Sequence, residues 1–307
     1  MLLLKSPKFW TKKDSLISIL LYPLSILYLI IIFLNKKIQI ISSKNIEIKT
    51  ICIGNLYIGG TGKTPTVIKL YEMISKNKNC CVIKKFRKQH IDEINLLEKF
   101  TNLITGRTRV QALIQAKEKG NEIAIMDDGM QDFTFKKNIS ILCIKSKQGF
   151  GNQKTLPSGP LREPLSNIKN YQITIINGEK NNQIEELLNK YNKDMSIFYS
   201  NYELINKDQI HNKKFLAFSG IADNQNFFSL LERNKATLII KKEFNDHFIF
   251  NDKDILNLIN EAKIKNLELI TTEKNHQNIP DKYKDVVLYA KIKLNINDED
   301  KLINEIC

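Results

Sequence analysis

The sequence predicts an α/β fold: a core with a parallel sheet, a second, smaller α/β lobe, and a hydrophobic helix near the N-terminus. Short apolar runs rich in Ile, Val and Cys alternate with segments of helical periodicity, which favours a parallel sheet buried on both faces. The almost wholly apolar segment 16–34 predicts the N-terminal helix. With 307 residues, the chain is long enough for two packed lobes.

The core is predicted from elements between residues 46 and 191. A β-branched run at 46–53 ends at Gly54, and a glycine-rich turn at 59–64 leads into a helix at 65–75. The further predicted strands are 80–83, 123–126, 140–144 and 172–176, and the further predicted helices are 91–100 and 184–191. This alternation indicates parallel strands joined by right-handed crossovers.

The second lobe is expected after a polar connection that follows residue 191. Its predicted strands are 214–218, 237–240, 267–271 and 286–292. We therefore divide the chain into a membrane-associated helix at 1–37, a core at 38–205 and a C-terminal α/β lobe at 206–307. Within the core, the glycine- and proline-rich segment 149–164 predicts an ordered, functional loop.

The apolar segment 16–34 is only marginally long enough to cross a bilayer, which takes about 20 residues. Lysines flank it on both sides and give no clear orientation, and Pro23 is expected to bend a spanning helix. A true span and a helix lying in the cytoplasmic face both remain open, and a core helix of a soluble domain is the third reading. A cleaved signal peptide is disfavoured because no small-residue cleavage site follows.

The composition argues against a disulfide-bonded or zinc-binding protein and favours no particular partner. The 47 basic and 33 acidic residues give a net charge of +14, but the lysines are dispersed, so the charge gives little support to any partner. The five cysteines form no CxxC pair and the four histidines show no metal-ligand spacing, which argues against disulfides and a zinc site.

Residues 59–64, GGTGKT, have the pattern of a phosphate-binding loop. A strand that ends in a glycine loop and opens a helix directs backbone N–H groups and the positive helix end to one point. Lys63 can then reach the β- and γ-phosphates of a nucleotide, and the Thr64 hydroxyl can coordinate Mg²⁺. The strict pattern GxxxxGK[ST] has glycine where this chain has Tyr57. The core is therefore predicted to be P-loop NTPase-like.

Asp127 and Asp128 follow the predicted strand at 123–126. In a P-loop fold, a metal-holding acidic residue belongs at such a strand end. On its own, an Asp-Asp-Gly sequence is more often a turn or a cap, so the metal site depends on the phosphate loop beside it.

Further motifs occur in order along nearly the whole chain. They are PKFW at 7–10, YPLSILY at 22–28, IGNLYIGGTGKTP at 53–65, DE at 92–93, DDGMQ at 127–131, GFGN at 149–152, LPSGPLREP at 156–164, FSGIADNQNFF at 218–228, DH at 246–247 and TEK at 272–274. This set resembles the tetraacyldisaccharide 4′-kinase family, which phosphorylates the lipid A precursor of Gram-negative bacteria.

The resemblance implies an enzyme that uses ATP and Mg²⁺ to phosphorylate the 4′-hydroxyl of a tetraacyldisaccharide 1-phosphate. Asp92 would be the base that helps to deprotonate this hydroxyl, with His247 beside it, and Asp246 and Lys63 complete the implied catalytic set. The implied ATP-binding residues are Tyr57, Ile58, Gly59, Gly60, Thr61, Gly62, Lys63, Thr64 and Arg162. The implied metal-binding residues are Thr64, Asp127, Asp128 and Glu163.

We also expect a monomer without a nucleic-acid partner, bound to a glycolipid substrate and to the membrane surface. Its expected location is the cytoplasmic face of the inner membrane of a Gram-negative bacterium.

Three positions depart from the family pattern. A serine-arginine-glycine-tyrosine-glycine segment usually precedes the DE pair, and here the shortened KKFRKQHI at 84–91 replaces it. A histidine often follows the DH pair, where this chain has Phe248, and an aspartate usually follows TEK, where it has Asn275. The first departure lies next to Asp92 and bears on how the acceptor sugar is held.

A membrane-associated P-loop NTPase that acts as a regulator or chaperone is the alternative function. A GTPase of that kind would carry a guanine-reading NKxD motif, and TEKN at 272–275 lacks its final aspartate. A nucleic-acid binder would show clustered basic residues with exposed aromatic side chains, whereas the charges here are dispersed. The lipid kinase is the preferred prediction.

Overall fold

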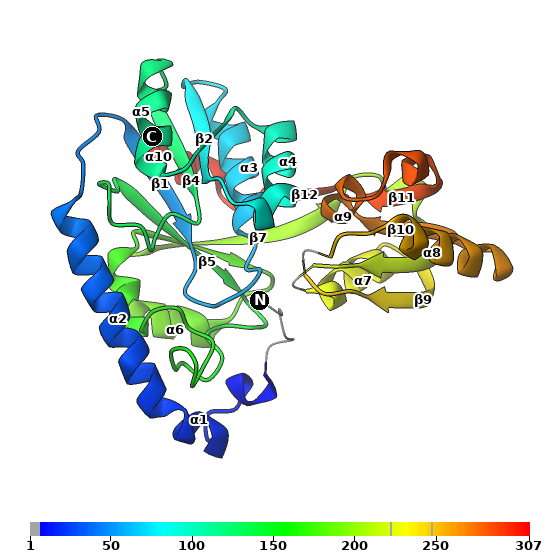
Figure 1. The fold of residues 1–307 in the computed structure, drawn as a ribbon, viewed down its shortest axis with the longest axis horizontal. Helices are drawn as coiled ribbons and strands as arrows, with labels where there is room; N and C mark the ends of the chain where they lie inside the picture. The colour runs from blue at the N-terminus through cyan, green and yellow to red at the C-terminus, as the bar shows by residue number, and fades with distance from the viewer. Residues whose placement is uncertain (1–6, 222, 247) are drawn as a thin grey trace. The chain divides into compact units, whose positions relative to one another are not determined.

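The computed structural model describes residues 7–221, 223–246 and 248–307, which form two compact units. The larger unit comprises residues 7–86, 100–201 and 295–307, and the smaller unit comprises residues 87–99 and 202–294. Each unit is built on its own sheet, which confirms the predicted α/β fold (Figure 1). The domain limits predicted at 37 and 205 do not follow these contact-based units and stay a prediction.

Within the described residues, the sheet of the larger unit has eight strands in the order β12-β7-β6-β5-β1-β4-β2-β3. These strands are β1 (Lys49–Gly54), β2 (Cys80–Lys85), β3 (Leu103–Gly106), β4 (Ile123–Asp127), β5 (Ile139–Lys145), β6 (Ile173–Asn177), β7 (Ser196–Leu204) and β12 (Ile292–Ile296). The strand β1 pairs in parallel with β4 on one side and β5 on the other. The direction of winding therefore changes at β1, and ligands of open α/β sheets bind at the carboxyl ends of such strands.

The sheet of the smaller unit has the order β11-β10-β8-β9, and its neighbouring strands pair in parallel. Its strands are β8 (Lys214–Ser219), β9 (Thr237–Glu243), β10 (Glu268–Thr272) and β11 (Val287–Ala290). The single strand predicted at 286–292 is wrong, because β11 and β12 belong to different sheets. No glycine or proline separates the two, so the sequence shows no break. The polar connection predicted after residue 191 is also wrong in part, since β7 lies there.

Helices connect most of the strands (Figure 1). The α-helices are α1 (Leu16–Leu20), α2 (Tyr22–Ile41), α3 (Lys63–Ile74), α4 (Ile91–Phe100), α5 (Arg109–Glu118), α6 (Asn182–Tyr191), α7 (Asn224–Arg233), α8 (Asp252–Ile264), α9 (Glu273–Gln277) and α10 (Glu299–Ile306). Short 3₁₀ helices are η1 (Lys8–Thr11), η2 (Lys88–His90), η3 (Leu165–Asn170), η4 (Lys207–Gln209) and η5 (Asp281–Val286).

The apolar segment near the N-terminus forms two helices instead of one. Pro23 lies in the first turn of α2, where a backbone N–H has no helical acceptor to lose. The helix is interrupted at Leu21, two residues before Pro23, so the expected bend takes the form of a break between α1 and α2. The helix α2 has 20 residues and a mean hydropathy of 1.8 in its most apolar window, so it is long and apolar enough to cross a membrane.

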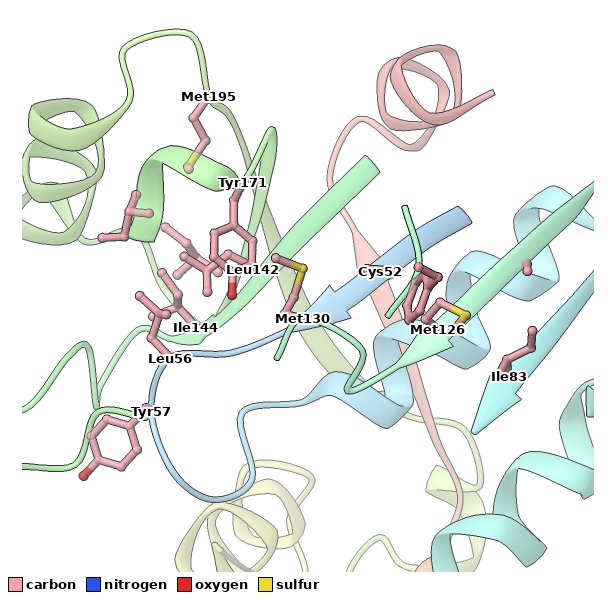
Figure 2. Packing of buried hydrophobic residues seen from close by; sticks show 14 of the residues in the cluster. Cys52, Leu56, Tyr57, Ile83, Met126, Met130, Leu142, Ile144, Tyr171 and Met195 are labelled. Atoms are coloured by element: carbon pink, nitrogen blue, oxygen red, sulfur yellow. The ribbon is translucent and has the colours of Figure 1, made fainter. Parts of the chain in front are cut away.

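The hydrophobic core of the larger unit includes residues of β1, which leads into the phosphate loop, and of β4, which ends at Asp127. Cys52 of β1, Ile83 of β2 and Met126 of β4 lie near one another in this core (Figure 2). A β-carbon at position 54 would lie 2.3 Å from Cγ of Met130, so Gly54 leaves the space that this methionine occupies. The segment after β4 thus packs directly on the segment after β1.

Candidate active site

The phosphate loop begins at the end of β1 and leads into α3. Gly59 and Gly62 have φ angles of +110° and +91°, which glycine adopts without strain. Gly62 is the residue before the first turn of α3, and Lys63 is the first residue of that helix. The amide of Asn55 donates to the carbonyl oxygens of Tyr57 (2.5 Å) and Gly59 (3.2 Å) and so holds the curvature of the loop.

The loop 149–164 is hydrogen-bonded to the segment that leads into the phosphate loop. The N–H of Ile58 donates to the carbonyl of Pro160 at 2.9 Å, and the N–H of Arg162 donates to the carbonyl of Leu56 at 2.7 Å. The side chain of Tyr57 is buried in the core, where a tyrosine fits and no glycine is needed (Figure 2). Gly60 is exposed, whereas Thr61 is buried. Nucleotide binding by these residues stays a prediction.

Three cationic side chains surround Asp128, and we call this group the Asp128 cluster. Lys63 Nζ lies 3.6 Å from Oδ1 of Asp128, and Arg162 Nη1 lies 3.1 and 3.2 Å from its two carboxylate oxygens. Arg109, at the start of α5, donates from Nη2 to the carbonyl oxygen of Asp128 at 2.7 Å. Three fixed cations at the mouth of a phosphate loop suit a polyanionic ligand.

The cations also control the charge of Asp128. Burial alone would raise the pKa of its carboxyl group, but the charges of Lys63 and Arg162 hold that pKa well below its ordinary value. Asp128 therefore stays ionised at any physiological pH. Its carboxylate forms the ion pairs with Lys63 and Arg162.

Asp127 is the last residue of β4 and lies beside Ile53 of β1 in the parallel register. Its side chain is fully buried and forms an ion pair with Lys84 through Oδ2. Within the part of the chain that the structure describes, its other oxygen Oδ1 is buried without a hydrogen-bond partner. A buried carboxylate oxygen in this state can accept from a metal-bound water.

The predicted metal ligands do not gather into a cluster of side chains. Glu163 is buried and accepts from Nδ2 of Asn167 at 2.5 Å. No group of three or more His, Cys, Asp or Glu side chains among the described residues could hold a metal. Mg²⁺ in P-loop proteins usually takes only one or two side chains, together with phosphate oxygens and waters. Thr64, in the first turn of α3, and Asp127 fit that requirement, and the metal-binding roles stay predictions.

A second charged group lies in the smaller unit, and we call it the Lys274 cluster. Lys274, in α9, lies with its Nζ 3.0 Å from Oδ2 of Asp92 and 3.2 Å from Oδ1 of Asp246. Asp92 is in the first turn of α4 and only 3% exposed, and Asp246 follows β9. The structure thus brings two predicted catalytic carboxylates together around a lysine. His247 lies outside the described residues.

Carboxylates determine the charge of Lys274. Burial lowers the pKa of its ammonium group, but Asp246, Asp92 and the nearby Glu93 raise that pKa above its ordinary value. Lys274 is therefore protonated throughout the physiological range.

Two of the three departures from the family pattern have a structural explanation. Asn275 is fully buried, and its amide accepts from the N–H of Gly220 at 2.9 Å and donates to the carbonyl of Gly220 at 3.2 Å. A carboxylate could make only the first of these bonds. Phe248 packs in an aromatic group, with its ring centroid 4.8 Å from that of Phe244 and 5.0 Å from that of Phe250.

Three charged residues in or beside these clusters received no role from the sequence. Lys84 lies in the shortened segment, Arg109 follows a Thr108 cap, and Lys274 ends the TEK motif. The TEK motif could have marked Lys274 as functional, but the ion-pair partners of Lys274, Asp92 and Asp246, are distant from it in sequence. For Lys84 and Arg109 no local pattern distinguishes them from the many surface basic residues.

The parallel sheet, the glycine loop between β1 and α3, and the buried aspartate at the adjacent strand end define a P-loop nucleotide-dependent enzyme. The model of the family described as LpxK: Tetraacyldisaccharide-1-P 4′-kinase matches residues 17–85 and 84–307. The chain belongs to this family. The predicted family and its kinase function in lipid A biosynthesis are therefore confirmed.

Relatives match along nearly the full length. The chain is 40% identical to the tetraacyldisaccharide 4′-kinase of Pelagibacter ubique, over 99% of this chain and 97% of the relative. It is 30% identical to that of Rickettsia akari, again over 99% and 97% of the two chains. A solved structure of LpxK from Aquifex aeolicus in complex with ATP has a TM-score of 0.72 at 24% identity, with 95% of this chain and 99% of that chain covered, and shows the same fold.

Proposed function

We propose that the chain transfers the γ-phosphate of ATP to the 4′-hydroxyl of a tetraacyldisaccharide 1-phosphate, using Mg²⁺. The observation that carries this proposal is the Asp128 cluster at the mouth of the phosphate loop. Two of its three cations, Lys63 and Arg162, are paired with a single carboxylate. The phosphates of ATP offer these cations a more highly charged partner.

The residues of the larger unit neutralise charge during transfer. Lys63 and Arg162 stabilise the negative charge that spreads over the transferred phosphoryl group and the departing oxygen of ADP. Thr64 and Asp127 would hold Mg²⁺, which would supply positive charge to neutralise the phosphates. Arg109 donates to the carbonyl oxygens of Asp127 (3.4 Å) and Asp128 (2.7 Å) and so fixes the backbone that carries both carboxylates.

The acceptor hydroxyl must lose its proton as its oxygen bonds to the γ-phosphorus. By resemblance to the family, Asp92 takes this proton, while the bond from the γ-phosphorus to the bridging oxygen breaks and ADP leaves. Asp246 and His247 belong to the same proposed group. The burial of Asp92 supports this assignment, because a base in a dry site is kept from bulk water.

We place the protein on the cytoplasmic face of the inner membrane of a Gram-negative bacterium, as a monomer that meets its glycolipid there. The support comes from α1 and α2, whose serines are buried while most of their large apolar side chains are exposed. Ser18 and Ser25 are buried and donate to the carbonyls of Ser158 (2.7 Å) and Thr155 (3.0 Å). Large apolar side chains of the two helices are exposed, among them Leu16 (77%), Leu20 (79%) and Ile41 (87%). Exposed apolar surface of this extent marks a membrane or protein contact.

The helix α2 and the short helix η1 are tied to the loop that carries Arg162. Tyr28 donates to the carbonyl of Arg162 at 3.0 Å, and the Trp10 indole donates to the carbonyl of Pro157 at 3.1 Å. A helix held at the membrane would therefore also hold the Asp128 cluster near the lipid head groups.

The test of the activity is a transfer assay with labelled ATP, Mg²⁺ and the disaccharide lipid bearing a free 4′-hydroxyl. We expect label in the lipid, and none when the acceptor already carries a 4′-phosphate. ATP hydrolysis without labelled lipid would contradict the proposal and favour a regulatory NTPase.

The membrane contact is tested with vesicles of phosphatidylethanolamine and phosphatidylglycerol. The triple variant Leu27→Ser, Ile31→Ser, Leu34→Ser changes side chains that are 56%, 59% and 55% exposed. We expect vesicle affinity to fall about 100-fold, because each lost side chain removes about 1 kcal/mol of apolar burial.

The matched control changes Ile239, Ile249 and Ile264 of the smaller unit to Ser, which are 50%, 74% and 84% exposed. Co-sedimentation of these two variants with vesicles gives the comparison. Equal losses in both would show that α2 is not the membrane contact.

A further inference from the structure

Two ion pairs connect α4 to α9 in the smaller unit. Lys274 of α9 pairs with Asp92 of α4 at 3.0 Å, and Lys99 of α4 pairs with Glu273 of α9 at 2.6 Å. The side chains of the two pairs differ in exposure: those of Lys274 and Asp92 are 18% and 4% exposed, and those of Lys99 and Glu273 are 41% and 13% exposed. An exposed pair contributes little to stability, while a buried one fixes its members in place.

The buried ion pair between Lys274 and Asp92 includes a further contact that does not connect the two helices. Lys274 reaches a second carboxylate, Asp246, at 3.2 Å, so one ammonium bridges residues from α4 and from the segment after β9. The turn that carries Lys274 is itself fixed: the hydroxyl of Thr272 accepts from the N–H of Asn275 at 3.1 Å, and Asn275 is bound to the backbone of Gly220. The turn fixes the backbone at Lys274, and the two ion pairs fix its ammonium between Asp92 and Asp246.

We propose that Lys274 is a positioning residue of the transfer reaction, which holds Asp92 and Asp246 side by side and fixes the Asp92 side chain that accepts the proton. The inference rests on the proposed function. Two neighbouring carboxylates without a cation would repel each other and rotate apart, or one would take up a proton before the substrate arrives. The ammonium prevents both, and the proton of the acceptor hydroxyl is left to go to Asp92 as the new O–P bond forms.

The test compares Lys274→Met with Lys99→Met, since both remove one ion pair between the same two helices. For Lys274→Met we expect kcat to fall about 10- to 100-fold, the loss typical of a misplaced catalytic group, with the KM for ATP within about two-fold of wild type. For Lys99→Met we expect kcat within about two-fold of wild type, because its partner Glu273 takes no part in the reaction. Lys274→Arg restores the positive charge and should recover part of the lost kcat.

Each result has a definite meaning. Equal losses of kcat in Lys274→Met and Lys99→Met would show that Lys274 only docks the helices, and a wild-type kcat in Lys274→Met would overturn the inference outright. If Lys274→Met does not fold, as judged by circular dichroism, Lys274→Gln is judged by the same criteria, because its amide still hydrogen-bonds to a carboxylate. If the wild-type protein transfers no phosphate, the proposed function is refuted. If the wild type and the Lys274 variants are equally active, only the role of Lys274 is refuted.

Discussion

The two charged clusters have opposite composition. In the larger unit, the carboxylate of Asp128 faces three cations, Lys63, Arg162 and Arg109, although Arg109 also pairs with Asp132 at 3.2 Å. In the smaller unit, the single ammonium of Lys274 faces Asp246, Asp92 and Glu93. The pKa of Asp128 is lowered and that of Lys274 is raised, so both central groups keep their charge. The difference lies in the groups around them: an excess of cations binds a polyanion, and an excess of carboxylates accepts a proton.

This contrast corresponds to the two halves of phosphoryl transfer. The donor ATP brings negative charge that must be neutralised, and the acceptor hydroxyl brings a proton that must be removed. Substitutions in the two clusters should therefore differ in their effect on ATP affinity. The first two of the four predictions below test this division, and the last two test the stability of the clusters.

The largest effect is expected in the Lys274 cluster. Asp92→Asn keeps the shape of the side chain but removes the base, so kcat should fall about 10²- to 10⁴-fold. ATP affinity, measured by equilibrium binding, should hardly change. The control Asp252→Asn breaks the exposed pair with Lys282 in the same unit and should leave kcat unaltered. A large loss of ATP affinity in Asp92→Asn would contradict the proposal that the Asp128 cluster binds ATP and the Lys274 cluster removes the proton.

In the Asp128 cluster, Lys63→Ala should lower kcat about 10²- to 10³-fold, the loss typical of removing one group that stabilises transition-state charge. Here ATP affinity should fall as well. Lys63 is the first residue of α3 and is not part of the hydrophobic core, so the circular dichroism spectrum should match that of wild type. Lys78→Ala, which breaks the exposed pair with Glu122, is the control. Undiminished transfer in Lys63→Ala would refute the assignment of the phosphate loop.

A smaller effect, on stability, is expected at Asn275, which follows Lys274 and is hydrogen-bonded to Gly220. Asn275→Ala leaves the N–H and carbonyl of Gly220 without their side-chain partner, and should lower the free energy of unfolding by about 1–3 kcal/mol. Denaturant titration measures this loss. Gln225→Ala removes an exposed hydrogen bond to Glu243 and should change stability little. Equal stability in the two variants would mean that α9 is fixed by other contacts.

The smallest effect concerns pH. The pKa of Asp128 is lower in the folded chain than its ordinary value of 3.8, so its ionised form stabilises the fold above pH 3.8 and this contribution is lost as the pH falls below that value. At pH 7, wild type should melt about 2–4 °C above Asp128→Asn, as expected for about 1 kcal/mol in a chain of this size. The difference should shrink in thermal melts below pH 3.8. A constant difference across that range would show that the charge of Asp128 does not stabilise the fold.

Much of the fold could be predicted because it depends on local patterns. The strands at 80–83, 123–126 and 140–144 appear as β2, β4 and β5 with ends that differ by at most two residues. The helix predicted at 91–100 has the predicted bounds. The predictions failed at 286–292 and in β7, where no glycine or proline marked a boundary and where burial alternates with exposure.

By itself, the sequence determined the α/β class, the phosphate loop at 59–64, the apolar N-terminal helix and the family. Each of these depends on residues close together in the chain, or on motifs read in order. Only the tertiary structure decided that Lys84 neutralises Asp127, that Arg109 holds the backbone of Asp128 and that Lys274 joins Asp92 to Asp246. The physical reason is that an ion pair depends on the distance between two charges, and folding sets that distance between residues that the sequence keeps far apart.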